Sequence, residues 1–532
     1  LKRKEANGCE GVNVLRELVL VDPISGPSHG SPEVPETVVN GENQVDSSVK
    51  GYKSGGNFEF SITGGDMVTY MLEGEAPTYL KFEAWLQGEG QGCPTIIKEV
   101  ICDFKDLFMD KLPPELPPER VIDHTITLLP GKMPSKGALY KLGREELEAQ
   151  REILAQLKAA KWITLTSSPF AAPSMIVGKK DDSSGKRQYR MVVNYQELNS
   201  MTISPEYPLP TIQDILDMLH GAKVFTIMDM EQGFHQIRVS PTDQYKTAFR
   251  TCMGQYEFKV MPFGLRGAPG TFQTIMNEMF FPFIGRGVIA YLDDLLVYSP
   301  DEESHAVLLR KVLKILRDNR MYPKISKCHF GEGEIEYLGY RVTKDGIVPS
   351  SEKVKAIEVW PEELQNESQV KQFLGTINYC RMFMGPAFAD LAKPLVELTK
   401  KGVDFKWETR HTEALKSLKY QLAHYVTLQM PDTSKPFTLK TDASGYAVGA
   451  VLEQDGKPIG FLSKKMSPAE TRYATYDQEL LAVIRALEKW RQLLLTAEVT
   501  IYTDHRALQY LLTLKGSKPV RGRIARWMLF LS

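Results

Sequence analysis

Two adjacent aspartates, Asp293 and Asp294, stand between two short apolar runs near the middle of the chain. The flanking residues, 287–292 and 295–298, are almost entirely apolar and long enough for buried strands. Short apolar runs of this kind favour strands, and aspartate is common in the turn that joins two strands. The pattern therefore predicts a tight β-hairpin with two carboxylates at its tip. Taken alone, an Asp-Asp pair is most often only a turn former, so its function depends on what lies near it.

A third aspartate follows another apolar run. Residues 223–228 predict a buried strand that ends on Asp229. Phosphoryl transfer by two divalent ions about 4 Å apart needs several hard oxygen ligands on rigid elements. Asp229 at one strand end, with Asp293 and Asp294 in a neighbouring strand reversal, would supply such ligands.

The length of the chain requires several domains, because 532 residues exceed what one hydrophobic core supports. A net charge of -1 argues against a uniformly basic nucleic-acid coat and leaves room for a local basic groove. The six cysteines form no Cys-x-x-Cys pair, and no apolar run approaches the roughly 20 residues that cross a bilayer. We therefore expect an intracellular protein with reduced thiols, no signal peptide and no membrane partner. Both ends, Leu1 and Ser532, look like cuts from a longer protein.

Four successive segments are expected from composition and periodicity. Residues 1–95 are rich in Gly, Pro and Ser and are predicted to be disordered or a linker, with structure beginning near Thr95. Residues 96–345 contain the strands around the aspartates. Residues 346–430 are predicted to be mostly helical, with breaks near Pro361, Pro386 and Pro394. Residues 431–532 show strands, then a long helix over 468–490, then a strand and a helix over 505–512, which predicts a smaller α/β domain.

This last segment contains three acids in ordered settings. Asp442 ends a predicted strand, Glu479 lies inside the predicted long helix, and Asp504 ends the next strand. Any one of them alone is more often a helix cap or a surface acid. Cleavage of the RNA strand of a hybrid also uses two metals, held by carboxylates from separate elements.

The chain resembles the reverse transcriptases of gypsy-type (Metaviridae) long-terminal-repeat retrotransposons. The resemblance lies in ordered segments: Asp123-His124-Thr125-Ile126, Ser168-Pro169-Phe170-Ala171-Ala172-Pro173, Tyr189-Arg190-Met191-Val192-Val193-Asn194-Tyr195, Gly233-Phe234-His235-Gln236-Ile237, Met261-Pro262-Phe263-Gly264-Leu265, Ala268-Pro269-Gly270-Thr271-Phe272-Gln273, Tyr291-Leu292-Asp293-Asp294 and Tyr337-Leu338-Gly339-Tyr340. It implies an α+β right-hand polymerase of fingers, palm and thumb, then a helical connection and a C-terminally truncated RNase H-like α/β domain. It also implies an RNA- and DNA-dependent DNA polymerase with two Mg²⁺ per active site, which Mn²⁺ can replace.

The resemblance also implies roles for individual residues. Asp229, Asp293 and Asp294 would be catalytic and bind the metals. The other positions match nucleotide-binding residues, namely Lys179, Lys180, Arg190, Phe234 as a steric gate against ribose, and Gln273, and primer-binding residues, namely Tyr337, Leu338, Gly339 and Tyr340. A solvated basic hairpin is the alternative for the lysines and Arg190, and a core aromatic is the alternative for Phe234. Asn194 and Gln196 depart from the usual Asp and Arg, and Arg266-Gly267 from Thr-Asn.

The C-terminal acids lie in segments that resemble the RNase H domain of the same elements. These segments are Thr441-Asp442-Ala443-Ser444, Tyr476-Asp477-Gln478-Glu479-Leu480-Leu481-Ala482 and Tyr502-Thr503-Asp504-His505. The resemblance makes Asp442, Glu479 and Asp504 catalytic, metal-binding residues. The family uses a fourth aspartate further on than Ser532, so we expect weak or absent cleavage by this fragment.

The implied partners are an RNA or DNA template with its primer, an RNA:DNA hybrid and deoxynucleoside triphosphates. Protease and integrase domains are expected elsewhere in the same element, and the expected location is the cytoplasm, in virus-like particles. Two alternatives are weighed. A non-catalytic nucleic-acid-binding relic is disfavoured by the intact Asp229, Asp293 and Asp294. An RNA polymerase that shares the palm is disfavoured by Phe234 and by the RNase H unit.

Overall fold

The computed structural model describes a defined part of the chain, residues 78–132, 136–178, 189–203, 207, 210, 214–215, 218–495, 497–505 and 522–531. The chain divides into two compact units, Leu1–Glu73 and Gly74–Ser532. The first unit lies outside the described residues, so the fold below is that of the second.

A helix, α1 (Leu80–Gln87), lies inside the segment expected to be linker. Its buried Phe82 and Trp85 join the core, where the Phe82 ring stacks on Phe108 at a centroid distance of 5.6 Å. The expectation that structure begins near Thr95 is therefore wrong. Helix α2 (Thr95–Asp103) begins where predicted.

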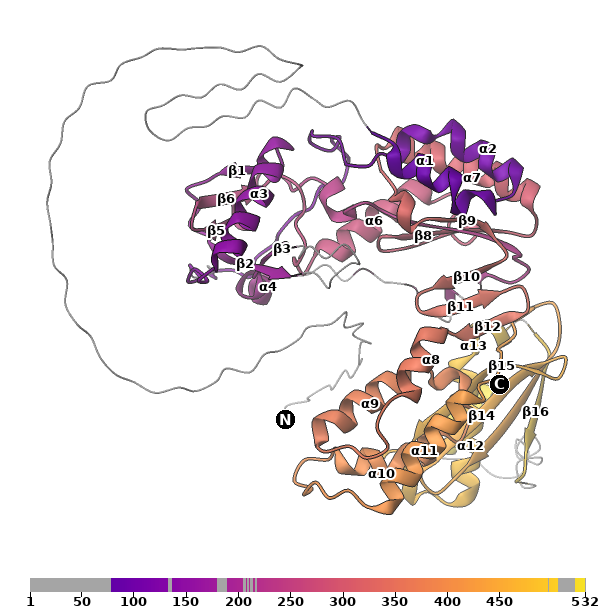
Figure 1. Ribbon diagram of the computed structural model, residues 1–532. Helices are drawn as coiled ribbons and strands as arrows, with labels where there is room; N and C mark the ends of the chain where they lie inside the picture. The colour runs from indigo at the N-terminus through magenta and orange to yellow at the C-terminus, as the bar shows by residue number, and fades with distance from the viewer. Residues whose placement is uncertain are drawn as a thin grey trace, which may run out of the picture. The chain divides into compact units, whose positions relative to one another are not determined.

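The predicted strands around the aspartates form one antiparallel sheet in the order β7-β8-β4-β9. Its strands are β7 (Val288–Tyr291), β8 (Asp294–Ser299), β4 (Val224–Asp229) and β9 (His329–Glu332). Figure 1 shows α1, α2 and α7 (Glu302–Asp318) gathered beside β8 and β9, and α6 (Ala268–Phe280) near β8.

The sequence of strand β4 shows no alternation of polar and apolar residues, because both faces of the strand are buried. Val224 and Met228 pack into one hydrophobic core, and Phe225 and Ile227 pack into another. Successive side chains of a strand point to opposite faces of the sheet. Both faces of β4 are therefore buried, and the strand separates the two cores.

A second sheet has the order β1-β6-β5-β2-β3 and lies close to helix α3 (Arg144–Ala159). Its strands are β1 (Ile163–Leu165), β6 (Gly254–Phe258), β5 (Phe249–Thr251), β2 (Ala172–Gly178) and β3 (Tyr189–Val193). The predicted hairpin of β2 and β3 is confirmed, with Val177 opposite Arg190. Lys179 and Lys180 lie outside the described residues.

A small antiparallel sheet follows, and it crosses the boundary expected at residue 346. Its strands are β10 (Glu334–Tyr337), β11 (Tyr340–Thr343) and β12 (Gly346–Pro349). Because β12 pairs along β11, with Val342 opposite Ile347, a division between 345 and 346 would cut the sheet. The change from sheet to helices falls after Pro349.

The helical connector contains four α-helices in the described residues. They are α8 (Ser351–Glu358), α9 (Glu367–Tyr379), α10 (Phe388–Leu398) and α11 (Thr409–Ala423). The break expected at Pro394 is wrong, since Pro394 lies inside α10. Proline removes one backbone donor, but buried neighbours such as Ala392 and Leu395 hold the helix in a core that also contains Leu415 of α11.

The C-terminal segment forms a sheet in the order β15-β14-β13-β16. Its strands are β13 (Phe437–Ala443), β14 (Ala447–Gln454), β15 (Lys457–Lys465) and β16 (Val499–Thr503). Strands β13 and β16 are parallel, and the connection between β15 and β16 contains α12 (Thr475–Lys489), which begins later than the predicted residue 468. The helix expected over 505–512 lies outside the described residues except for His505.

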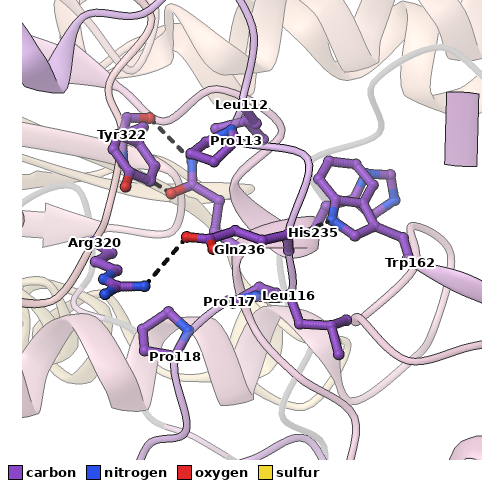
Figure 2. A pocket seen from close by; sticks show the side chains of 11 residues that line it. Leu112, Pro113, Leu116, Pro117, Pro118, Trp162, His235, Gln236, Arg320 and Tyr322 are labelled. Carbon is purple, nitrogen blue, oxygen red and sulfur yellow. Dashed lines mark hydrogen bonds and ion pairs between the residues drawn. The ribbon is translucent and has the colours of Figure 1, made fainter. Parts of the chain in front are cut away.

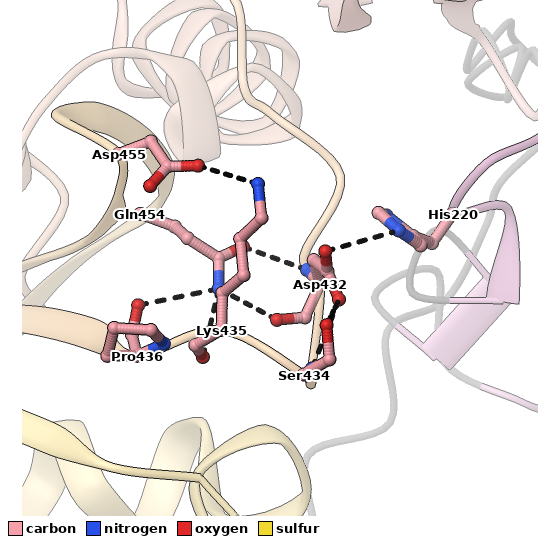
Figure 3. Close-up of polar contacts among 7 residues, drawn as sticks. All are labelled: His220, Asp432, Ser434, Lys435, Pro436, Gln454 and Asp455. Atoms are coloured by element: carbon pink, nitrogen blue, oxygen red, sulfur yellow. Dashed lines mark hydrogen bonds and ion pairs between the residues drawn. The ribbon is translucent and has the colours of Figure 1, made fainter.

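A buried amide organises the loop that leads into this sheet. Gln454 accepts from the backbone of Asp432 at 2.9 Å and donates to its carbonyl at 2.7 Å (Figure 3). The Asp432 carboxylate also accepts from the Ser434 hydroxyl. Its Oδ2 lies 3.9 Å from Nε2 of His220, a residue that comes shortly before β4 in the chain. Within the described ranges, no helix is long and apolar enough to cross a membrane.

Candidate active sites

Asp229, Asp293 and Asp294 lie at one edge of the β7-β8-β4-β9 sheet. Asp229 lies directly opposite Asp294 on the neighbouring strand, and Tyr291 closes the hairpin opposite Asp294. Directly opposite residues of an antiparallel pair have Cβ atoms about 4.5–5.5 Å apart. Leu292 and Asp293 form the loop, and the carbonyl of Asp293 accepts from the backbone of Met230 at 3.2 Å. The predicted hairpin with acids at its tip is confirmed.

A lysine that the sequence reading did not select completes the surroundings of Asp229. Nζ of Lys327 lies 2.8 Å from Oδ2 of Asp229. Burial raises the pKa of Asp229, the Lys327 ammonium opposes that rise, and the charge of Asp293 adds to it. Asp229 thus already has a cation as its partner. Lys327 is half exposed, so a divalent ion bound by Asp229 has room to displace it.

The three acids of the C-terminal domain, Asp442, Glu479 and Asp504, converge on one point. Ligand atoms of Asp442, Glu479 and Asp504 all lie within 4.8 Å of one another, the one group of three potential metal ligands found among the described residues. The parallel register of β13 and β16 places Thr441 opposite Thr503, which brings the two following aspartates side by side. Helix α12 then presents Glu479 to both.

The state of Glu479 shows that this group fits a divalent ion. Oε2 of Glu479 is buried and has no hydrogen-bond partner among the residues that the structure describes. Burial and the charges of Asp504 and Asp442 raise the pKa of Glu479 to about 7. An unpaired buried carboxylate oxygen beside two further carboxylates is a hard-oxygen donor set, which suits Mg²⁺ or Mn²⁺. A bound cation would supply the missing partner of Glu479.

Gln273, which the resemblance assigns to nucleotide binding, is fully buried. Its Oε1 accepts from the backbone of Leu292 at 2.7 Å, and its Nε2 donates to the carbonyl of Ala290 at 2.8 Å. Both ends of the side chain amide are therefore occupied by the β7–β8 turn. Helical position alone did not show which face of α6 meets that turn.

The segment predicted to bind the primer is the tip of the β10–β11 hairpin. The Tyr337 and Tyr340 side chains are buried, so they face the core rather than a primer. The loop residues Leu338 and Gly339 both have positive φ, 51° and 76°, and the Tyr379 hydroxyl donates to the carbonyl of Leu338. Only the backbone and the Leu338 side chain of this tip remain for a primer contact.

Phe234 lies in a cluster of rings. Its centroid is 5.0 Å from that of Phe263 and 5.7 Å from that of Phe272. Phe263 is 51% exposed, so the cluster reaches the surface while Phe272 anchors it in the core. Arg190 lies exposed on β3. Asn194, one of the departures from the family pattern, accepts from the backbone of Gln196 at 3.1 Å and so stabilises the start of α4 (Gln196–Met201).

A small cavity lined in part by His235 and Gln236 is too small to be a nucleotide site. Its volume is about 30 Å³, and proline-rich residues 112–118, Trp162, His235, Gln236 and Tyr322 line it (Figure 2). The Gln236 amide donates to the carbonyl of Tyr322 at 3.0 Å and accepts from its backbone nitrogen at 2.8 Å. A space of this size holds about one water molecule, so the cavity is a small gap in the packing between these segments.

Comparison with known proteins identifies the two domains. Residues 177–342 match the family "Reverse transcriptase (RNA-dependent DNA polymerase)", and residues 432–532 match the "RNase H-like domain found in reverse transcriptase". The Pol polyprotein of transposon 297 from Drosophila melanogaster is 38% identical over 382 residues, which cover 71% of this chain and 36% of that protein. The chain contains a reverse transcriptase domain and an RNase H-like domain similar to those of retrotransposon Pol polyproteins.

Further relatives agree with this family. The Pol polyprotein of the Drosophila transposon opus is 37% identical over 400 residues, with 72% of this chain and 39% of that protein covered. The Tf2-3 polyprotein of Schizosaccharomyces pombe is 34% identical over 446 residues, with 82% and 33% covered. The predicted resemblance to gypsy-type elements is confirmed. This reverse transcriptase chain spans about a third of the length of these curated relatives.

The fold is that of solved viral reverse transcriptases. A foamy viral protease-reverse transcriptase in complex with double-stranded DNA matches with a TM-score of 0.74 at 21% identity, over 87% of this chain and 82% of that one. The same viral enzyme in complex with an RNA/DNA hybrid matches with a TM-score of 0.70 at 21% identity, over 87% and 62%. The predicted polymerase fold with an RNase H-like domain is confirmed.

Proposed function

We propose that this chain extends a primer on an RNA or DNA template with deoxynucleoside triphosphates, and that its second site cleaves the RNA of an RNA:DNA hybrid. The observation that carries the proposal is the pairing of Asp229 with Asp294 at the edge of the palm sheet, inside the matched reverse transcriptase domain. The solved foamy viral relatives are complexes with double-stranded DNA and an RNA/DNA hybrid, which supports the same class of partner here.

Asp229, Asp293 and Asp294 would hold two Mg²⁺, which Mn²⁺ can replace. Bound there, the ions would activate the primer 3′-hydroxyl and stabilise the leaving pyrophosphate. The residues of the chain supply the rest. Strand β4 fixes Asp229 between two cores, and the β7–β8 hairpin fixes the other two acids.

The nucleotide is proposed to lie between the fingers hairpin and the ring of Phe234. Arg190, with Lys179 or Lys180, would bind the triphosphate through charge-assisted hydrogen bonds. Phe234, held by Phe263 and Phe272, would collide with a ribose 2′-hydroxyl. A primer end is proposed to meet the tip at Leu338 and Gly339 through backbone groups.

Asp442, Glu479 and Asp504 would hold the two Mg²⁺ of the RNase H site. Their convergence within 4.8 Å supports cleavage of the RNA strand. No fourth carboxylate joins them among the described residues, and the proposed cleavage is weak.

We propose domain limits that follow the observed elements. Fingers and palm, including the small sheet, would extend from α1 to Pro349, the helical connector would cover 350–430, and the RNase H-like domain would begin near 431. The protein is proposed to act in the cytoplasm, in virus-like particles, and to be encoded with a protease and an integrase. No membrane partner is proposed.

The test is primer extension by the purified chain on an RNA template with deoxynucleotides and Mg²⁺. The wild-type chain is expected to extend the primer, and Asp294→Asn is expected to abolish extension while template-primer binding persists. Absence of extension by the folded wild-type chain would refute the polymerase assignment. A labelled hybrid tests the second site, where full-strength cleavage would contradict the expected weakness.

A further inference from the structure

The turn that carries the polymerase acids has an unusual backbone. Leu292 has φ of 54°, in the left-handed region that a leucine rarely adopts. It is followed directly by Asp293 and Asp294. Any relaxation of Leu292 would therefore turn both carboxylates away from Asp229.

Gln273 of α6 holds this turn from inside the core. Its Oε1 accepts from the Leu292 nitrogen at 2.7 Å, and its Nε2 donates to the Ala290 carbonyl at 2.8 Å. Nε2 also donates to Oδ1 of Asn277 at 2.9 Å, and Asn277 donates to the Tyr207 hydroxyl at 2.6 Å. The Gln273 side chain is fully buried, so no nucleotide competes for these groups.

We infer that Gln273 is a positioning residue for the polymerase metal ligands: it holds Leu292 in its left-handed conformation, so that Asp293 and Asp294 face Asp229. The inference deepens the proposed function and rests on it, because the acids are taken as metal ligands. Groups that orient metal ligands affect metal affinity or activity by about 10- to 100-fold when they are removed. A nucleotide-contacting residue would instead affect the KM for the nucleotide.

The first experiment compares the Gln273→Met variant with wild type, both as the full chain, in primer extension. The concentrations of Mg²⁺ and of deoxynucleotide are varied independently. The variant is expected to raise the Mg²⁺ concentration for half-maximal rate and lower kcat, by about 10-fold or more, while KM for deoxynucleotide at saturating Mg²⁺ is unchanged. A raised KM with an unchanged Mg²⁺ requirement would overturn the inference. Gln150→Met removes another buried glutamine, in the fingers, and is the matched control, expected to leave the Mg²⁺ requirement unchanged.

A double-mutant cycle separates positioning from general damage. Glycine adopts positive φ without strain, so Leu292→Gly should reduce the defect of Gln273→Met. An equal defect in both backgrounds would count against the inference.

Metal binding without substrates makes the inference testable apart from activity. Mn²⁺ titration followed by electron paramagnetic resonance, in a Glu479→Gln background that impairs the second site, is expected to show weaker binding for Gln273→Met by about 10-fold or more. If the wild-type chain binds Mn²⁺ but extends no primer, the proposed function fails, and this titration still decides the inference. Unchanged Mn²⁺ affinity in the Met variant would overturn it.

Discussion

Glu479 offers the sharpest prediction, because its charge is unfavourable in the folded protein unless a cation is bound. Burial and the charges of Asp504 and Asp442 raise its pKa to about 7 from an ordinary value of 4.5. The folded protein therefore binds more protons than the unfolded chain between these values, and the stability of the fold falls as the pH rises through that window. Glu479→Gln removes this titration while keeping the shape of the side chain.

The magnitude follows from the same contacts. Each pKa unit corresponds to about 1.4 kcal/mol. Asp442 and Asp504 are exposed, so water screens their charges, and we expect Glu479→Gln to stabilise the RNase H-like domain by about 1–2 kcal/mol at pH 8 without metal. At pH 5, where the folded protein holds Glu479 protonated, the gain should largely vanish.

Hydrogen exchange of amides in β13 and α12, read by mass spectrometry with chelator present, measures this domain without assuming that the whole chain unfolds in one step. Mg²⁺ should slow exchange in the wild type and have little effect in the variant. Glu470→Gln is the matched control of opposite sign. Burial alone would raise the pKa of Glu470, but hydrogen bonds from Ser467 and the Arg485 charge lower it, so its stabilising contribution is present at neutral pH and is lost in acid.

If Glu479→Gln changed exchange equally at pH 5 and pH 8, the raised pKa would not describe the folded domain. A destabilised variant at pH 8 without metal would show that the Glu479 carboxylate has a favourable partner in solution. Either result would contradict the inference that Asp442, Glu479 and Asp504 are arranged to hold a cation.

Three further predictions concern the polymerase part. Phe234→Ala should raise the ratio of ribonucleotide to deoxynucleotide kcat/KM by about 10-fold or more, and an unchanged ratio would show that this ring is only a core aromatic. Lys327→Gln should tighten Mn²⁺ binding at the palm about two- to five-fold, since an exposed ion pair contributes about 0–1 kcal/mol, and weaker binding would contradict displacement of the ammonium. Gly339→Ala should lower stability by about 1–3 kcal/mol, because its φ is 76° and an added Cβ would lie 2.5 Å from the Tyr379 hydroxyl oxygen; Gly375→Ala, with open space around it, is the thermal-unfolding control.

Sequence reasoning found the acids because local pattern fixes them. Asp229 ends β4, Asp294 begins β8 and Asp442 lies one residue before the end of β13, each in a strand that the sequence predicted. The contact of Lys327 with Asp229 joins β4 to a turn far along the chain, and no local pattern encodes such a distance. The resemblance assigns Gln273 to the nucleotide, and nothing in the local sequence shows that its side chain meets the β7–β8 turn.

The segment before Thr95 shows a different limit. Its glycine and glutamate residues outweigh Phe82 and Trp85 in composition, yet these two rings pack against Phe108 and Phe330. Composition averages over a window, whereas a short helix needs only two well-placed aromatics to join a core. Pro394 shows the converse, because a local helix breaker is outweighed by the burial of its neighbours in α10.

Strand β4 couples the stability of the fold to the position of a proposed metal ligand. Its alternate side chains belong to two cores, and its last residue is Asp229. A repacking on either side that shifts the strand by a fraction of an ångström moves the carboxylate by a similar amount, and catalytic rates are sensitive to displacements of about 1 Å. Evolution should therefore conserve the side-chain volume on both faces of β4 more strictly than in other buried strands. Where a substitution changes the volume in one core, we expect a compensating substitution in the other core.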